Sequence, residues 1–182
     1  MRQAINIVFS VGWIAFWIGW MAAASRVKRG ASQWRGYVGF RLLVAALIVA
    51  GSHVHAFRGS APHDATMDVL GLALFVVGIA IAVWARVHLG RNWGTPMSQK
   101  EDPELVTSGP YRWVRNPIYS GLILAFAGTG LAVDLRWLIP MAPIGAYFVY
   151  SAVKEQRYME EQFPNTYPAY RASTRMLIPF IY

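Results

Sequence analysis

The sequence has no cysteine and few charged residues. Cysteine is absent from all 182 positions, and Asp, Glu, Lys and Arg together make up only 14%, against about 25% in a typical soluble domain. The lack of cysteine excludes disulfides, thiolate metal sites and cysteine nucleophiles. With 55% hydrophobic residues, the chain is also too apolar for an ordinary soluble domain or a disordered segment. Its length fits one domain.

Long apolar runs occupy most of the chain instead. A bilayer core about 30 Å thick needs about 20 apolar residues in each crossing helix. Five segments approach that length: Ala4–Ala24, Gly36–Phe57, Val69–Val87, Ile118–Val133 and Leu135–Val153. The sequence therefore predicts an all-α integral membrane protein with about five transmembrane helices, organised as one membrane domain over residues 1–182.

The fourth and fifth predicted spans are joined by almost no chain, so we expect them to form a helical hairpin. The fourth span also carries small residues on one helical face, which predicts close packing against another helix. These small residues are Gly121, Ala125, Gly128 and Ala132.

The basic residues divide unevenly between the two sides of this topology. With the N-terminus outside, 13 of the 17 Lys and Arg residues lie in cytosolic stretches and three lie outside, as the positive-inside rule requires. The net charge of +8 thus follows membrane topology, and nucleic acid is not a predicted partner. The size and the absence of cysteine favour a bacterial or archaeal inner membrane, with the C-terminus cytosolic.

Two features near the N-terminus have alternative interpretations. The first apolar run ends in Ala22–Ala24, which resembles a signal-peptide cleavage site, but the positive charges that follow it favour a retained helix. Arg41 lies inside the second predicted span. Its side chain either extends to the cytosolic interface or contacts an anionic lipid or substrate group, and it is our candidate for substrate binding.

The cytosolic stretch before the hairpin is longer than a connection between helices needs, which suggests a function. Gly109 begins a Gly-Pro turn signal, and Pro117 suits the first position of the next helix. Asn116 then becomes the N-cap. Arg115 would lie at a helix N-terminus at the membrane surface, where backbone donors and a guanidinium suit an anionic group.

The basic and the aromatic residues of this stretch also have simpler explanations. Arg115 fits the positive-inside charge pattern, and the neighbouring aromatic residues fit an interfacial aromatic belt. These aromatic residues are Tyr111, Trp113 and Tyr119.

Glu155 is the acidic residue closest to the bilayer in the C-terminal stretch. A carboxylate there is costly unless it has a partner. Glu155 therefore either forms a structural ion pair with a basic loop residue or accepts hydrogen bonds from the hydroxyls of a bound ribose. His53 and His55 are two positions apart and do not share a helix face, so no metal site is predicted.

Three motifs of the second half resemble the isoprenylcysteine carboxyl methyltransferase and phospholipid methyltransferase superfamily. The longest is Leu-Val-Thr-Ser-Gly-Pro-Tyr-Arg-Trp-Val-Arg-Asn-Pro-Ile-Tyr-Ser-Gly at 105–121. Upstream, Arg-Val-His-Leu-Gly-Arg-Asn-Trp at 86–93 is similar to the superfamily's R-x-x-L-G-x-x-W stretch. Downstream, Glu155, the tyrosines of Phe-Pro-Asn-Thr-Tyr-Pro-Ala-Tyr at 163–170 and Pro179 are similar to its C-terminal pattern.

This resemblance implies a membrane enzyme that uses S-adenosylmethionine. Residues 1–66 would supply two N-terminal transmembrane helices, and residues 67–182 a methyltransferase-like core. The cofactor pocket would lie at the cytosolic face, formed by the loop 86–117 and the C-terminal segment. Membrane lipids would surround the protein, and a lipophilic or prenylated acceptor would enter from the bilayer.

Site residues follow from these motifs. The predicted catalytic residues are Arg115, Asn116 and Glu155. The predicted cofactor-binding residues are His88, Gly109, Pro110, Tyr111, Arg115, Asn116, Pro117, Tyr119, Glu155, Tyr167 and Tyr170. The predicted substrate-binding residues are Arg41 and Trp113.

The sequence departs from the superfamily pattern at two of these positions. Asn116 stands where His is frequent, and Asn does not titrate near neutral pH. Gln156 replaces the second of two paired Glu residues. The predicted reaction is most like protein-S-isoprenylcysteine carboxyl O-methylation. The alternatives are methylation of a phospholipid or small thiol, an NADPH-dependent membrane reductase of related fold, and a non-catalytic membrane module.

Overall fold

The computed structural model describes residues 2–24, 64–92 and 104–178. Its long helices are α1 (Arg2–Ala24), α3 (Ala65–Leu89), α4 (Pro117–Val133) and α5 (Leu138–Gln162). The shorter elements are the 3-10 turns η2 (Gly90–Asn92), η3 (Gly109–Arg112) and η4 (Leu135–Trp137) and the helix α6 (Tyr167–Ser173). The described part holds no strand, only an isolated bridge between Val114 and Arg175. The all-α prediction is therefore confirmed for these residues.

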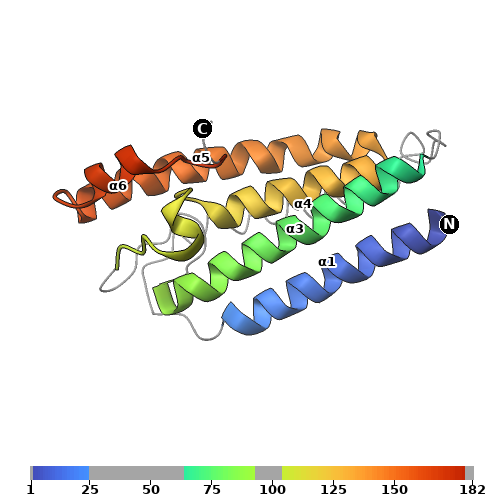
Figure 1. The fold of residues 1–182 in the computed structure, drawn as a ribbon, viewed down its shortest axis with the longest axis horizontal. Coiled ribbons are helices and arrows are strands. Elements are labelled where there is room, and N and C mark those ends of the chain that lie inside the picture. Colours follow the sequence, from blue (N-terminus) through green and yellow to red (C-terminus); the bar gives the residue numbers. More distant parts are fainter. Residues whose placement is uncertain (1, 25–63, 93–103, 179–182) are drawn as a thin grey trace.

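The four long helices lie lengthwise beside one another (Figure 1). Helices α1, α3 and α5 run in one direction and α4 runs in the other, so the start of α4 lies at the same end as the ends of the other three. This end also holds η3 and α6. We call it the loop end of the bundle.

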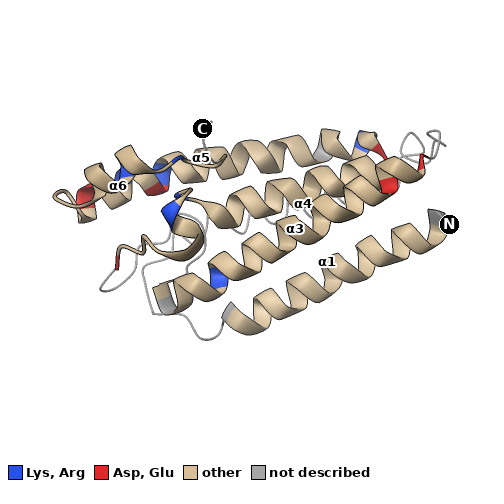
Figure 2. Cartoon of the chain, viewed as in Figure 1, with Lys and Arg blue, Asp and Glu red and all other residues tan. Residues whose placement is uncertain are grey.

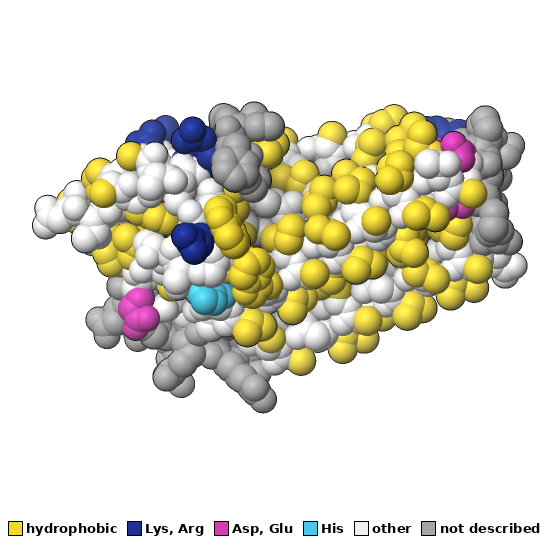
Figure 3. Space-filling view, in the orientation of Figure 1, with side chains coloured by type: hydrophobic (Ala, Val, Ile, Leu, Met, Phe, Trp, Pro, Cys, Tyr) yellow, Lys and Arg dark blue, Asp and Glu magenta, His cyan; other side chains and the backbone are white. Residues whose placement is uncertain are grey.

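Charged residues of the described chain lie toward the two ends of the bundle, and its middle carries none (Figure 2). Hydrophobic side chains cover the middle of the visible face (Figure 3). Many of the large ones on α1 and α3 are exposed, among them Ile14, Ile18, Val69 and Val76. An exposed apolar belt between polar ends is the pattern expected of a surface that contacts lipid.

Two described helices are long and apolar enough to cross a membrane, Gln3–Ala23 within α1 and Ala65–Leu89. Helix α4 is apolar but has only 17 residues. Helix α5 begins apolar and ends with the charged sequence Lys-Glu-Gln-Arg-Tyr-Met-Glu-Glu-Gln. The predicted span Gly36–Phe57, with Arg41, lies outside the described residues. The number of five transmembrane helices stays a prediction.

Helices α3 and α4 approach each other closely through glycine. A Cβ added to Gly78 would lie 2.5 Å from the carbonyl oxygen of Gly121, and one added to Gly71 would lie 2.6 Å from that of Gly128. Ala125 and Ala132 of α4 complete this contact. The predicted small-residue face of the fourth span is thus confirmed as a helix-packing face, and α3 is its partner.

Aromatic residues attach α1 to this pair. The Trp13 ring stacks on Phe126 of α4 with a centroid distance of 4.8 Å, and Phe9 packs on Phe75 of α3 at 4.9 Å. The Trp13 indole also donates a hydrogen bond of 3.1 Å to Thr129 Oγ1. At the loop end, the buried Arg86 of α3 donates to the carbonyl of Ala23 at 2.9 Å.

The hairpin between α4 and α5 is closed by Asp134. Its Oδ1 accepts from the backbone N–H of Arg136 at 2.9 Å, and its Oδ2 accepts from the Arg136 guanidinium at 2.7 Å. Helix α5 then continues through Pro140 and Pro143 without a break. Pro140 falls in the first helical turn, where a missing N–H has no consequence.

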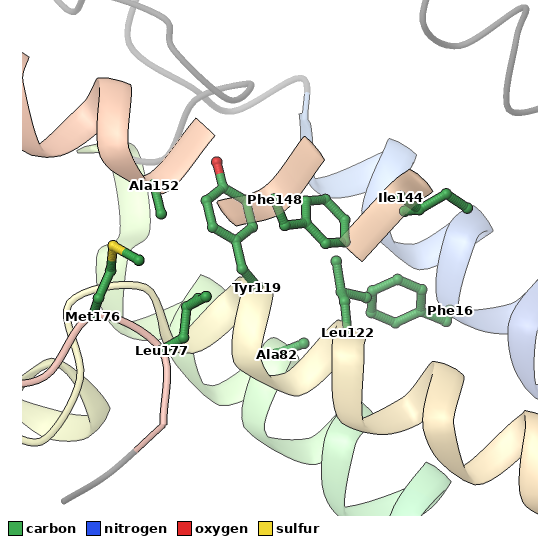
Figure 4. Close-up of a cluster of buried hydrophobic side chains, with 9 residues drawn as sticks. All are labelled: Phe16, Ala82, Tyr119, Leu122, Ile144, Phe148, Ala152, Met176 and Leu177. Carbon is green, nitrogen blue, oxygen red and sulfur yellow. The ribbon is translucent and has the colours of Figure 1, made fainter. Parts of the chain in front are cut away.

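The main core joins all four long helices and the C-terminal segment (Figure 4). Its buried members are Phe16, Ala82, Tyr119, Leu122, Ile144, Phe148, Ala152, Met176 and Leu177. In this core, Tyr119 of α4 stacks on Phe148 of α5 with centroids 4.9 Å apart and rings 12° from parallel. An aromatic stack therefore joins α4 to α5 near the loop end.

The glycine contact between α3 and α4 predicts a position-specific effect. Gly78→Ala should destabilise the protein by about 1–3 kcal/mol, because the new methyl group meets backbone atoms. Gly19→Ala is the matched control, since nothing lies within 4 Å of a Cβ at that position of α1. Thermal unfolding in detergent, followed by tryptophan fluorescence, should show a lower Tm for Gly78→Ala alone. Equal Tm values for both variants would contradict the close contact.

Candidate functional site

The short 3-10 turn η3 lies just before the start of α4 and packs against α3. Gly109 has a φ of +59°, a conformation that favours glycine. A Cβ there would also lie 2.8 Å from the His88 ring. His88 Nε2 lies 2.9 Å from Ser108 Oγ. The Gly-Pro turn of the sequence is thus a 3-10 turn whose glycine packs against the histidine of α3.

The residues after this turn pair with the C-terminal segment. The backbone N–H of Arg115 donates to the carbonyl of Arg175 at 2.8 Å, and that of Asn116 donates to Met176 at 3.1 Å. The N–H of Arg175 donates back to Trp113 at 3.2 Å. The segment therefore lies along the start of α4 like a short parallel strand.

Asn116 and Pro117 lie where the sequence predicts them, at the N-cap and the first position of α4. The Asn116 side chain does not cap the helix. Its Nδ2 donates instead to the carbonyl of Met176 at 3.2 Å. One turn into α4, the Ser120 hydroxyl donates to Leu177 at 2.5 Å. Both side chains hold the C-terminal segment in place.

Arg115 directs its guanidinium to the same segment. Nη1 donates to the carbonyls of Thr174 at 2.6 Å and Arg171 at 3.0 Å, and Nη2 donates to Gln156 Oε1 on α5 at 3.3 Å. Burial lowers the pKa of Arg115. Its Nε is buried and has no hydrogen-bond partner among the described residues. One donor of this charged side chain is therefore left over.

Glu155 lies at the centre of a group of tyrosines. Tyr119 donates to Glu155 Oε1 at 2.7 Å. Tyr170 donates to the carbonyl of Tyr111 at 2.7 Å, and its ring packs edge-on against Tyr167 at 5.8 Å. Tyr119 of α4 thus contacts the carboxylate directly, and Tyr111 of η3 and Tyr167 of α6 lie close enough to feel its charge.

The electrostatics of this group fix the protonation of its tyrosines. Burial raises the pKa of Tyr111, and the nearby Glu155 raises it further. Burial likewise raises the pKa of Tyr167 to about 12 and raises that of Tyr170. All three phenols therefore remain protonated at neutral pH and act as hydrogen-bond donors.

A cavity of about 580 Å³ lies on the other side of the turn. Its lining residues are His88, Leu89, Asn92, Glu104, Leu105, Val106, Thr107 and Ser108. Asn92 donates to Glu104 at its wall with a distance of 2.9 Å. The volume is within the range of about 300–1,000 Å³ usual for ligand pockets. Of the predicted cofactor-binding residues, only His88 lines it.

The predicted site residues thus fall into three groups. Eight gather where the turn, α4, α5 and the C-terminal segment meet: Tyr111, Arg115, Asn116, Pro117, Tyr119, Glu155, Tyr167 and Tyr170. His88, Gly109 and Pro110 lie at the turn beside the cavity. Trp113 is 47% exposed and lies between Trp84 of α3 and Arg112, and Arg41 lies outside the described residues.

Sequence patterns missed the residues that hold the C-terminal segment. Thr174 and Arg171 contribute through their backbone carbonyls, which carry no side-chain signature. Gln156 was noted only as a departure from the superfamily pattern, whereas it accepts a hydrogen bond from Arg115. Its position next to Glu155 was the one sequence feature that could have marked Gln156 as part of the site.

An apolar helix bundle with a polar site at one end is the architecture of a helical membrane protein. Comparison with known proteins identifies its family. The sequence model of the phospholipid methyltransferase family matches residues 66–166, more than half of the chain. The chain belongs to this family, which is part of the isoprenylcysteine carboxyl methyltransferase superfamily. Membership implies methyltransferase activity in general, and together with the two apolar helices it indicates a membrane protein.

Two curated relatives match parts of the chain. An uncharacterized protein of Bacillus subtilis, YpbQ, is 38% identical over 56 residues, which are 30% of this chain and 33% of that protein. The cobalt-zinc-cadmium resistance protein CzcN of Cupriavidus metallidurans is 28% identical over 101 residues, 54% of this chain and 42% of that protein. The chain thus spans less than half the length of either relative.

The contacts of Arg115 predict that it anchors the C-terminal segment. Arg115→Ala should speed amide exchange across residues 167–177 by about tenfold or more, because hydrogen bonds from a charged donor are lost. Hydrogen exchange followed by mass spectrometry measures this. Arg112→Ala is the control, since its exposed guanidinium lies over Trp113, 5.8 Å from the ring centre. Unchanged exchange in Arg115→Ala would show that the anchor lies elsewhere.

Proposed function

We propose that this protein transfers a methyl group from S-adenosylmethionine to a lipophilic acceptor at the membrane. The acceptor reaction is most like isoprenylcysteine carboxyl O-methylation. The observation that carries the proposal is the half-buried Glu155 at the loop end of an apolar bundle, hydrogen-bonded to Tyr119 and close to Tyr111. The methyltransferase family match, over residues 66–166, includes Glu155 and the turn before α4.

The described residues fit the chemical groups of this cofactor. Its sulfonium and ammonium are cations, which suit the Glu155 carboxylate and the tyrosine rings nearby. Its carboxylate suits the buried Nε of Arg115, which has no hydrogen-bond partner in the described region. The ribose hydroxyls suit Glu155 as an acceptor. The cavity beside His88 offers further polar contacts within the same loop.

When bound, S-adenosylmethionine supplies an electrophilic methyl group. The protein would contribute orientation and a dry site. Holding two reactants in line can lower a barrier by roughly 7–11 kcal/mol. Arg115 and Glu155, both tied to neighbouring elements, would hold the polar groups in fixed positions. The apolar middle of the bundle would leave the acceptor tail in lipid, so that only its polar end reaches the loop end.

A phospholipid amine is the second candidate acceptor, and the name of the matching family favours it. The two candidate acceptors differ in whether the protein must supply a general base. A carboxylate acceptor needs no general base, whereas a protonated amine must lose a proton before it attacks. Glu155 or His88 would accept that proton. A small thiol remains a third acceptor of the same class.

The proposal includes a multi-pass inner-membrane topology with the N-terminus outside and the loop end cytosolic. Its support is the positive-inside count and the cluster of Arg and Lys side chains at the loop end in Figure 2. A reporter fused after Tyr182 should read cytosolic, and a signal from the opposite side would overturn this orientation.

Labelled methyl transfer tests the proposed function. Purified protein in lipid nanodiscs receives S-adenosylmethionine with a radioactive methyl group and one of three acceptors: a prenylcysteine, a phospholipid amine or a lipophilic thiol. We expect label in one acceptor, and at least a tenfold loss of rate in Glu155→Gln because the carboxylate charge is removed.

Gly145→Ala is the matched control on the same helix, since nothing lies within 4 Å of a Cβ there. It should keep the wild-type rate. Label in no acceptor class, or an unchanged rate in Glu155→Gln, would contradict the proposal. An unlabelled product formed only with NADPH would favour the reductase alternative.

A further inference from the structure

We propose that Tyr119 is a positioning residue that holds the Glu155 side chain ionised and in one orientation. This inference rests on the proposed function, because Glu155 belongs to the same site. It assigns Tyr119 a different role from the cofactor contact that the sequence predicts.

The Tyr119 ring is not available to stack on a ligand. Its side chain is only 7% exposed. One face lies nearly parallel to Phe148, with centroids 4.9 Å apart. Figure 4 shows the ring between α4 and α5, with its oxygen directed toward α5 beside Ala152. The part of Tyr119 that meets the site is therefore its hydroxyl.

One face of α5 fixes both partners. Phe148 and Glu155 are seven residues apart, which is two helical turns, so they lie on the same side of α5. Phe148 sets the plane of the Tyr119 ring, and Glu155 Oε1 accepts a hydrogen bond of 2.7 Å from the Tyr119 hydroxyl. Tyr119 is the third residue of α4, two positions after the fully buried Pro117. The phenol thus has little freedom to leave the carboxylate.

The hydroxyl faces a charge that needs stabilisation. A carboxylate at the edge of an apolar bundle favours its neutral form unless donors reach it. Tyr119 donates to the ionised form, and the start of α4 adds the positive end of a helix dipole. Tyr111 of η3 and Tyr167 of α6 are two further titratable groups near Glu155. Both lie close enough to affect its charge, and Arg115 lies near Tyr167.

The test variant is Tyr119→Phe, which keeps the stacked ring and removes only the hydroxyl. Without this donor, the protonated carboxyl is favoured, so Glu155 should titrate at a pH about one unit higher. Carbon-13 NMR of protein labelled at the glutamate carboxyl groups measures the midpoint directly. The chain has five Glu residues, and Glu155→Gln identifies the signal. Tyr150→Phe, at an exposed position of α5, should leave the midpoint unchanged.

The pH–rate profile of methyl transfer gives the second readout. If the reaction needs ionised Glu155, its rate should fall as the pH drops through the pKa of that carboxyl. In Tyr119→Phe the midpoint of this fall should lie about one pH unit higher, and the rate at high pH should be nearly unchanged. An unmoved NMR midpoint overturns the inference. A shifted midpoint with an equal loss of rate at every pH overturns the link to the reaction. A shifted midpoint in a protein that transfers no methyl group supports the positioning role and refutes the proposed function instead.

Discussion

The close approach of α3 and α4 determines where everything else at the loop end lies. Gly71 and Gly78 of α3 meet Gly128 and Gly121 of α4 with no side chain between the two backbones. Membrane helices gain little from burying apolar surface against each other, so close packing of this kind is what holds them in register. The register fixes the end of α3 beside the start of α4. His88 therefore packs on Gly109, and Tyr119 lies within reach of α5.

The C-terminal segment completes the site that this register begins. It pairs with the backbone of Arg115 and Asn116 and buries Met176 and Leu177 in the core that contains Tyr119. Charged and polar groups thus meet at one end of an otherwise apolar bundle. In the proposed function, this arrangement would let a polar cofactor bind at the loop end while the acceptor tail stays in lipid. It also explains why Glu155, half-buried beside tyrosines, is the residue around which the proposed chemistry is built.

Sequence patterns predicted the helices well and the contacts of the site less well. Apolar run length identified α1, α3 and α4, and glycine spacing identified the packing face of α4, because both follow from helical periodicity. Asn116 and Pro117 were placed correctly from capping rules. The direction of the Arg115 guanidinium was not predictable, because its partners are backbone carbonyls of Arg171 and Thr174, more than fifty residues away. The stacking of Tyr119 on Phe148 likewise depends on tertiary packing.

The central claim is that the loop end binds S-adenosylmethionine through Glu155. Calorimetric titration of the purified protein in detergent with S-adenosylmethionine, and separately with NADPH, tests it most directly. The account predicts saturable binding of S-adenosylmethionine, weakened about tenfold or more in Glu155→Gln because a charged contact is lost, and no saturable binding of NADPH. Binding of NADPH alone, or equal affinity of the wild type and Glu155→Gln for S-adenosylmethionine, would contradict it.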